Sequence, residues 1–162
     1  KAARSMDPNY SKIILICTKY QDEISSFSGD EKDLLKKFWS YIQEKNPSKI
    51  ITHNGYKFDI PFIIVRSAIN STKPTYAINT NKWNMINSNH FDIMLFFSHN
   101  ENFINPNLLI LGKMHGIEVE GERIEGAEIE KLYENREFEN INKRCLQDIE
   151  LLENIYNKFF LQ

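Results

Sequence analysis

Residues 138–160 have the apolar spacing of one long amphipathic helix, and this helix constrains the fold more than any other segment. At about 100° per residue, one sector of the helix collects Ile141, Cys145, Ile149, Leu152, Ile155, Tyr156 and Phe159. Asp148 falls near the middle of that sector. A carboxylate turned toward a core is costly unless it is protonated, paired or bound to a cation. We therefore expect a partner for Asp148, and the simplest one is Arg144, four residues earlier.

Residues 50–62 combine a short apolar strand with the start of a second helix. The pattern predicts a strand at residues 50–52, and Pro61 suits the first turn of a helix that continues through Ile64, Val65 and Ala68. Asp59 then lies near the helix start, where a carboxylate can also cap the backbone. Asn54-Gly55 equally fits a two-residue hairpin turn, so the sequence leaves a β-hairpin open as an alternative.

The motif Asn54-Gly55-Tyr56-Lys57-Phe58-Asp59-Ile60-Pro61-Phe62, followed by Arg66, resembles the second motif of the DEDD 3′–5′ exonuclease superfamily. Within it, the sequence is most similar to the exonuclease domains of family B DNA polymerases and their stand-alone relatives. Cys145-Leu146-Gln147-Asp148-Ile149 resembles the third motif, an Asp on the final helix. His90-Phe91-Asp92-Ile93-Met94 resembles the stretch before a small helical insert, and residues 109–117 and 125–128 follow in the family's order.

The resemblance implies an α/β fold of the ribonuclease H type, with a mixed central sheet between helices on both faces. It implies a nuclease that hydrolyses phosphodiester bonds at the 3′ end of single-stranded nucleic acid, with Mg²⁺ or Mn²⁺ as cofactor. Asp59 and Asp148 are then catalytic metal ligands. Asn54, Tyr56 and Phe58 are expected near the 3′ terminus, and Arg144 against the substrate. A polymerase or another replication or repair protein is the implied partner.

Two positions depart from the family. Its first motif is an Asp-x-Glu pair on an opening strand, and residues 1–5, Lys-Ala-Ala-Arg-Ser, stand in that place. Arg144 stands where the third motif usually has a Tyr. Two-metal cleavage needs several carboxylates, and Asp59 with Asp148 supplies only part of such a site. We therefore expect an incomplete or altered front end, with the first strand of the domain missing.

The departures leave two hypotheses. In the first, a complete chain supplies the missing acids and the domain is an active exonuclease. In the second, the domain is catalytically inactive and binds nucleic acid or a protein partner. A net charge of −2 gives no overall attraction to nucleic acid, so either activity needs a local basic patch. The candidates are Lys57, Arg66, Lys73, Lys82, Lys143 and Arg144.

The remaining segments alternate between strand and helix patterns, as in a single α/β domain over residues 1–162. A buried strand is predicted at residues 12–19, and Ser28-Gly29-Asp30-Glu31 reads as a capping box. The next helix turns Leu34, Leu35, Phe38, Trp39 and Ile42 inward. Residues 91–97 fit a strand or a helix, and Pro106 opens a helix that ends near Gly116.

Both cysteines, Cys17 and Cys145, lie in apolar patterns and are interpreted as small core residues of a reducing compartment. No apolar run approaches the ~20 residues of a membrane span, and no signal peptide is recognised. A cytoplasmic location is the simplest expectation.

Overall fold

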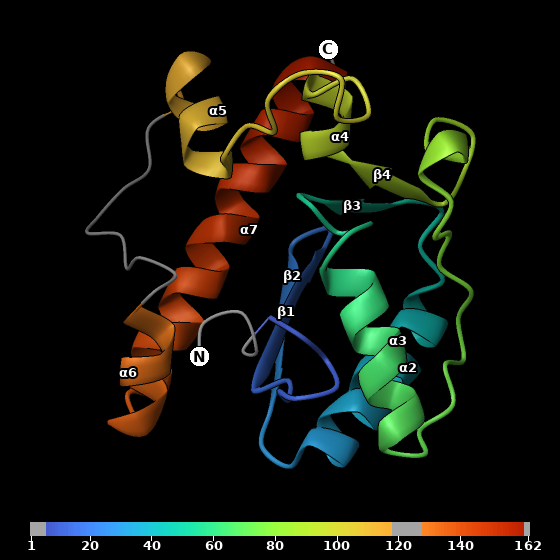
Figure 1. The fold of residues 1–162 in the computed structure, drawn as a ribbon, viewed down its shortest axis with the longest axis vertical. Coiled ribbons are helices and arrows are strands. Elements are labelled where there is room, and N and C mark those ends of the chain that lie inside the picture. The colour runs from blue at the N-terminus through green and yellow to red at the C-terminus, as the bar shows by residue number, and fades with distance from the viewer. Residues whose placement is uncertain (1–5, 118–127, 161–162) are drawn as a thin grey trace.

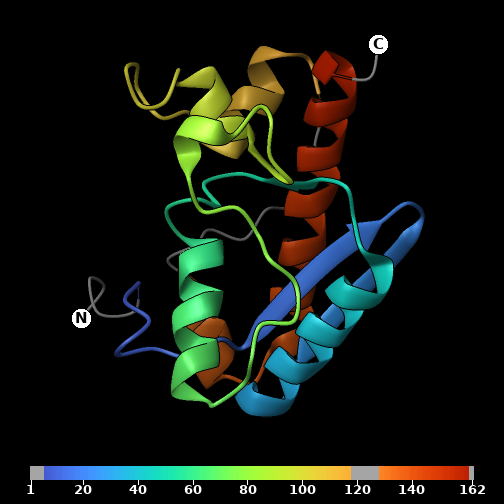
Figure 2. The same cartoon turned by 90° about the vertical axis from the view of Figure 1, so that its right-hand side faces the viewer.

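Two small β-sheets and the helices around them make up the computed structural model, which describes residues 6–117 and 128–160 (Figures 1 and 2). The strands are β1 (Leu15–Tyr20), β2 (Glu23–Ser28), β3 (Ile50–Thr52) and β4 (His90–Asp92). The helices are α2 (Glu31–Lys45), α3 (Asp59–Ile69), η1 (Lys82–Asn84), α4 (Ile93–Phe97), α5 (Leu108–Met114), α6 (Ile129–Glu134) and α7 (Phe138–Phe160).

The first sheet is an antiparallel hairpin of β1 and β2, in which Leu15 pairs with Ser28 and Tyr20 with Glu23. Strand β1 starts later than the predicted residues 12–19, and apart from the exposed Lys19 its residues are half-buried rather than buried. Strand β2 was not predicted, because its serines have weak strand propensity and its two apolar residues, Ile24 and Phe27, lie three positions apart and so do not alternate.

The second sheet pairs β3 with β4 in parallel, with Ile50 beside His90 and Thr52 beside Asp92. Neither β1 nor β3 has a second strand neighbour among the described residues. The mixed α/β class is therefore observed, but the central sheet expected from the resemblance is present only as two separate pairs of strands. The predicted departure at residues 1–5 lies outside the described residues.

Helices cover both sides of the hairpin. In both views the hairpin lies between α7 and α2, and contacts join α7 to β1 and α2 to both strands (Figures 1 and 2). Helix α2 begins at Asp30, whose carboxylate accepts the backbone N–H groups of Lys32 and Asp33 at 3.1 and 3.2 Å. Asp30 rather than Ser28 is thus the capping residue. The predicted inward face is confirmed: Leu34, Leu35, Phe38, Trp39 and Ile42 are buried.

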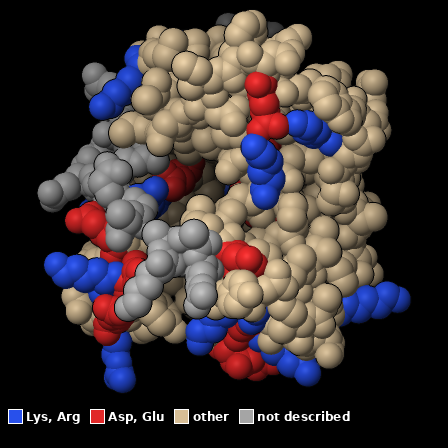
Figure 3. Space-filling model, in the orientation of Figure 1, with Lys and Arg blue, Asp and Glu red and all other residues tan. Residues whose placement is uncertain are grey.

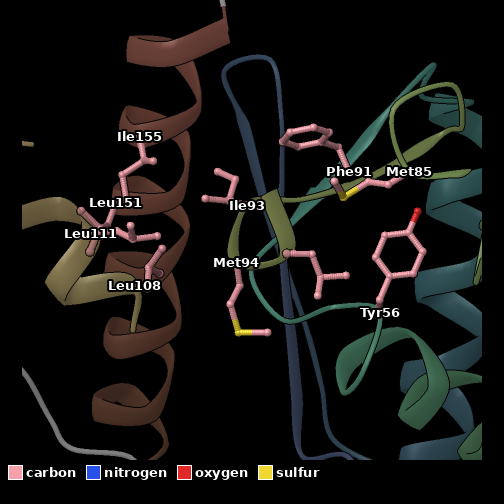
Figure 4. Packing of buried hydrophobic residues seen from close by; sticks show 10 residues of the cluster. Tyr56, Met85, Phe91, Ile93, Met94, Leu108, Leu111, Leu151 and Ile155 are labelled. Carbon is pink, nitrogen blue, oxygen red and sulfur yellow. The ribbon is translucent and has the colours of Figure 1, made fainter. Parts of the chain in front are cut away.

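The apolar core falls into two clusters. One lies among α2, α3 and the hairpin, and the other joins α7 and α5 to α4 and β4 (Figure 4). Leu151 and Ile155 of α7 meet Leu108 and Leu111 of α5 in this second cluster. Helix α7 has the predicted bounds. Helix α5 is found where it was predicted, but it begins after Pro106 instead of including it in the first turn, with Asn107 as its cap. No helix within the described ranges is long and apolar enough to cross a membrane.

Candidate functional site

The turn between β3 and α3 contains the predicted second motif. Asn54 adopts a positive φ of 67°, and its carbonyl oxygen accepts the N–H groups of Lys57 and Phe58 at 3.3 and 3.0 Å. The N–H of Ile60 then bonds to the carbonyl of Gly55 at 3.0 Å. The chain therefore turns directly into α3, and the hairpin alternative is wrong.

Gly55 is required at its position by close contact. A Cβ atom there would lie 2.2 Å from Thr52 Oγ1 and 2.5 Å from Thr52 Cβ. No real side chain tolerates such distances, so any larger residue would push the turn away from the end of β3.

Asp92 anchors this turn from the neighbouring strand. Its side chain is fully buried, and the β3–β4 register sets it beside Thr52, just before the turn. Oδ1 accepts the N–H of Asn54 at 2.9 Å, and Oδ2 accepts the N–H of Tyr56 at 3.2 Å. Oδ1 also accepts the N–H of Met94 at 2.9 Å, which caps α4. The sequence placed Asp92 only within the family-like stretch of residues 90–94, and its bonds to the turn were not predicted.

Tyr56, which the family resemblance places near the 3′ terminus, is a packing residue in this structure. The side chain is 7% exposed, and its ring stacks on His90 with centroids 4.0 Å apart. Its hydroxyl donates to the carbonyl of His90 at 2.7 Å and accepts from Asn79 Nδ2 at 2.7 Å. Phe58 is half-buried and packs against Phe62, so it is the more accessible aromatic side chain of the motif.

Asp59 is the first residue of α3, and the residue is exposed to solvent over part of its surface. Protein atoms packed around the carboxylate disfavour its charge and, together with the negative charge of Asp92, raise the pKa of Asp59 to about 6. An acid that is both accessible and electrostatically unfavourable would gain from a bound cation.

Asp148 has the partner that the sequence predicts. Arg144 Nε lies 3.6 Å from Asp148 Oδ2, across one turn of α7. The Asp148 side chain is 33% exposed, so the carboxylate does not face a dry core as its helical position suggested. The buried residues of α7 are Ile141, Leu151 and Ile155. Arg144 Nη1 is buried and makes no hydrogen bond in the described part of the chain.

The space-filling view shows a hollow near the middle of one face, with acidic atoms visible in its wall and charged groups around its rim (Figure 3). Within residues 6–117 and 128–160, no three His, Cys, Asp or Glu side chains come together as a metal site. Asp59 and Asp148 therefore belong to no completed ligand set there. Glu125, part of the family-like order, lies outside the described residues.

Most of the predicted basic patch is neutralised. Arg66 pairs with the buried Glu31, its Nε lying 2.9 Å from Oε1, so it holds α3 against α2. Lys57 and Lys82 both pair with Glu101 on the loop between α4 and α5, the second through an Nζ–Oε2 distance of 2.6 Å. Arg66 is thus a structural residue, and the two lysines share one carboxylate.

A protein-family model described as "Predicted 3'-5' exonuclease related to the exonuclease domain of PolB" matches residues 10–159. The chain belongs to this family. This PolB-type exonuclease domain is also similar, over 48 residues, to the DNA polymerases of Pyrococcus glycovorans and Thermococcus litoralis, with 40% identity to each. These segments cover 30% of the chain but only 6% and 3% of the two polymerases. A DNA polymerase of Thermococcus aggregans is 38% identical over 48 residues.

Proposed function

We propose that this PolB-type domain is a metal-dependent exonuclease that hydrolyses phosphodiester bonds at nucleic-acid 3′ ends, with Asp59 and Asp148 as metal-binding catalytic residues. One observation carries the proposal. The turn that precedes Asp59 is bound at two backbone N–H groups by the buried Asp92, while Asp59 itself stays accessible. Rigid support beneath an exposed acid is typical of a site that must hold a ligand in fixed geometry.

The substrate side of the proposal rests on Asn54, Phe58 and Arg144. The backbone of Asn54 is fixed by Asp92, so its side chain extends from an ordered turn. Phe58 is the accessible aromatic of the motif, and an aromatic face can stack on a terminal base of any sequence. Arg144, whose side chain is 20% exposed, supplies a cation that can pair with a phosphate oxygen.

The described residues do not complete a site for Mg²⁺ or Mn²⁺. Two carboxylates are too few for a two-metal site, and Arg144 lies beside one of them. We propose that a further strand pairs between β1 and β3 and brings additional acids to this place. Such a strand would join the two sheets into the three-layer ribonuclease H-type fold that the family resemblance implies. The names of the similar polymerases favour a polymerase as the partner.

The test uses the full-length protein and single strands labelled at the 3′ or the 5′ end. With Mn²⁺ present, stepwise loss from the 3′ end is expected. Asp59→Asn and Asp148→Asn should each abolish it with folding intact by circular dichroism, whereas Asp22→Asn, in an exposed turn, should keep it. Undiminished cleavage by either site variant would overturn the assignment.

A second candidate function is an inactive domain that binds single-stranded nucleic acid. The observation in its favour is the ion pair of Arg144 with Asp148, because a guanidinium there replaces part of the charge that a metal would supply. This candidate predicts affinity that is unchanged by EDTA and reduced by Arg144→Gln. Binding that requires Mg²⁺ would exclude it.

A further inference from the structure

Trp83, on the short helix η1, is largely open to solvent. It is one of two tryptophans in the chain, and it is 75% exposed. The other tryptophan, Trp39, is 2% exposed and donates its indole N–H to Ser67 Oγ at 2.9 Å. Trp39 is thus a core residue, whereas most of the surface of Trp83 is free to contact a ligand.

Hydrogen bonds hold η1 in place beside the second motif. Asn81 Oδ1 accepts the backbone N–H of Trp83 at 3.1 Å and so caps η1. The carbonyl of Asn81 accepts a hydrogen bond from Asn79 Nδ2 at 2.9 Å, and the same amide group donates to the hydroxyl of Tyr56 at 2.7 Å. The buried tyrosine of the motif is therefore joined to the turn that carries Trp83.

Two lysines share one carboxylate next to the indole ring. Lys82 Nζ lies 5.0 Å from the centroid of the Trp83 ring and 2.6 Å from Glu101 Oε2. Glu101 Oε1 pairs with Lys57 of the motif turn. These contacts place the ring and both lysines around a single anionic group. Because two ammonium groups face one carboxylate, the group as a whole has one positive charge in excess.

The backbone that supplies this carboxylate is strained. His99, Asn100 and Glu101 have φ values of 50°, 56° and 73°, a left-handed region that residues other than glycine seldom adopt. Such strain is costly and persists where surrounding contacts enforce it. Here the contacts are the Glu101 N–H bond to Ser98 Oγ at 3.1 Å and the two lysine pairs. Replacing the carboxylate by another anion would release the side chain and let this backbone relax.

We propose that the ring and the two lysines form a subsite for one nucleotide of a single strand. The Trp83 indole stacks on the base, which needs no particular sequence because every base has an aromatic face. Lys57 and Lys82 bind a phosphate where the Glu101 carboxylate now lies, since ammonium groups pair with either anion.

The subsite deepens the proposed function and rests on it for one point, that the ligand is a single-stranded nucleic acid. Lys57 directly precedes Phe58 and Asp59 in the motif, so the bound nucleotide lies close to the 3′ terminus. An exposed tryptophan also suits a protein contact, but two lysines around one anionic group favour a phosphate.

The experiment measures binding of an oligothymidylate to the full-length protein in EDTA, which removes the metal that cleavage requires. The difference in tryptophan fluorescence between wild type and Trp83→Phe isolates the signal of Trp83 from that of every other tryptophan. The bound strand should quench this signal and shield it from acrylamide, because the base covers the ring.

Variants separate stacking and charge from folding. Trp83→Leu, which keeps an apolar side chain without a ring, should bind roughly 5- to 100-fold more weakly. Phe138→Leu is the matched control, because Phe138 is 55% exposed at the start of α7, on the opposite side of the molecule from η1 (Figure 1). Lys82→Gln should reduce the slope of log affinity against log salt by about 0.7, the loss of one contact to a single strand. Lys36→Gln, at an exposed lysine of α2, should leave the slope unchanged.

Three results would overturn the inference. The first is strand binding that leaves the Trp83 signal unchanged, and the second is equal affinity of Trp83→Leu and Phe138→Leu. The third is a Trp83→Leu protein that changes its self-association but not its strand affinity, which would make Trp83 a protein contact.

The subsite and the exonuclease proposal can fail separately. Trp83 quenching by a strand that wild type does not cleave when Mn²⁺ is added would support the subsite and reject the exonuclease. Cleavage that depends on Asp59, together with unweakened strand binding by Trp83→Leu, would reject the subsite alone. Wild-type protein that neither binds nor cleaves the strand would reject both.

Discussion

The carboxylate of Asp92 lies directly against the turn at Asn54, accepting its backbone N–H at 2.9 Å. A single buried side chain therefore caps α4 and fixes the turn that leads to Asp59. This relationship makes β4 part of the candidate site, although no residue of β4 needs to contact a substrate.

Replacing Asp92 by Asn should destabilise the protein and loosen the turn. The amide keeps one acceptor but points a donor at backbone N–H groups, and unsatisfied buried groups cost about 1–3 kcal/mol. Urea unfolding should show a loss of that size, with faster hydrogen exchange at Asn54 and Tyr56. Asp22→Asn, at an exposed turn, is the matched control. If Asp92→Asn and Asp22→Asn are equally stable, Asp92 does not anchor the turn.

Asp59 should make the protein less stable as the pH rises through the range from 3.8 to about 6. Between these values the folded state keeps a proton that the unfolded chain has lost, so unfolding is favoured as pH increases. Asp59→Asn should flatten this part of the stability curve and raise stability at pH 7. Unfolding midpoints at several pH values, with saturating EDTA, measure the effect. A wild-type curve parallel to that of the variant would contradict it.

The Glu31–Arg66 pair should be worth far more than an exposed pair. Glu31 is 8% exposed and also accepts the Ile13 N–H at 2.6 Å and Asn70 Nδ2 at 3.0 Å. Removing one partner leaves a buried charge, so Glu31→Ala should cost about 3 kcal/mol or more. Lys36→Ala, which breaks the exposed pair with Asp33, should cost less than about 1 kcal/mol. Denaturant unfolding compares them, and similar losses would disprove the difference.

Glu101 should compete with nucleic acid for Lys57 and Lys82, because it pairs with both lysines. The hydrogen bonds from Lys57 and Lys82 lower the pKa of Glu101 to about 2. The stability that this carboxylate contributes is therefore fully present above pH 4.5 and is lost as the pH falls through about 2. Glu101→Gln frees both lysines and should tighten binding of single strands at low salt. Glu44→Gln, beside Lys45 only, is the control. Unchanged affinity would mean that Lys57 and Lys82 do not contact the bound nucleic acid.

Local patterns predicted several elements well. The apolar period of residues 138–160 is long, so the bounds of α7 follow from sequence, and Pro61 and Pro106 mark α3 and α5. Residues 91–97 fitted either type of element because they contain both: β4 ends at Asp92, which then caps α4.

Contacts between distant segments could not be predicted in this way. Asp148 lies in the apolar sector of α7, yet its exposure depends on where β1 and α5 leave the helix uncovered. The bond from the backbone of Tyr56 to Asp92 joins residues whose local sequences carry no sign of each other. The motif located Asp59 and Asp148, and only tertiary structure identifies Asp92 as the anchor.

The most direct test of the account is Mn²⁺ binding to the full-length protein, measured by calorimetry for wild type, Asp59→Asn, Asp148→Asn and the double variant. If both aspartates bind one metal centre, each single change should remove most of the affinity, and the double change should cost little more. Additive losses, or affinity that neither change reduces, would show that Asp59 and Asp148 do not share a metal site.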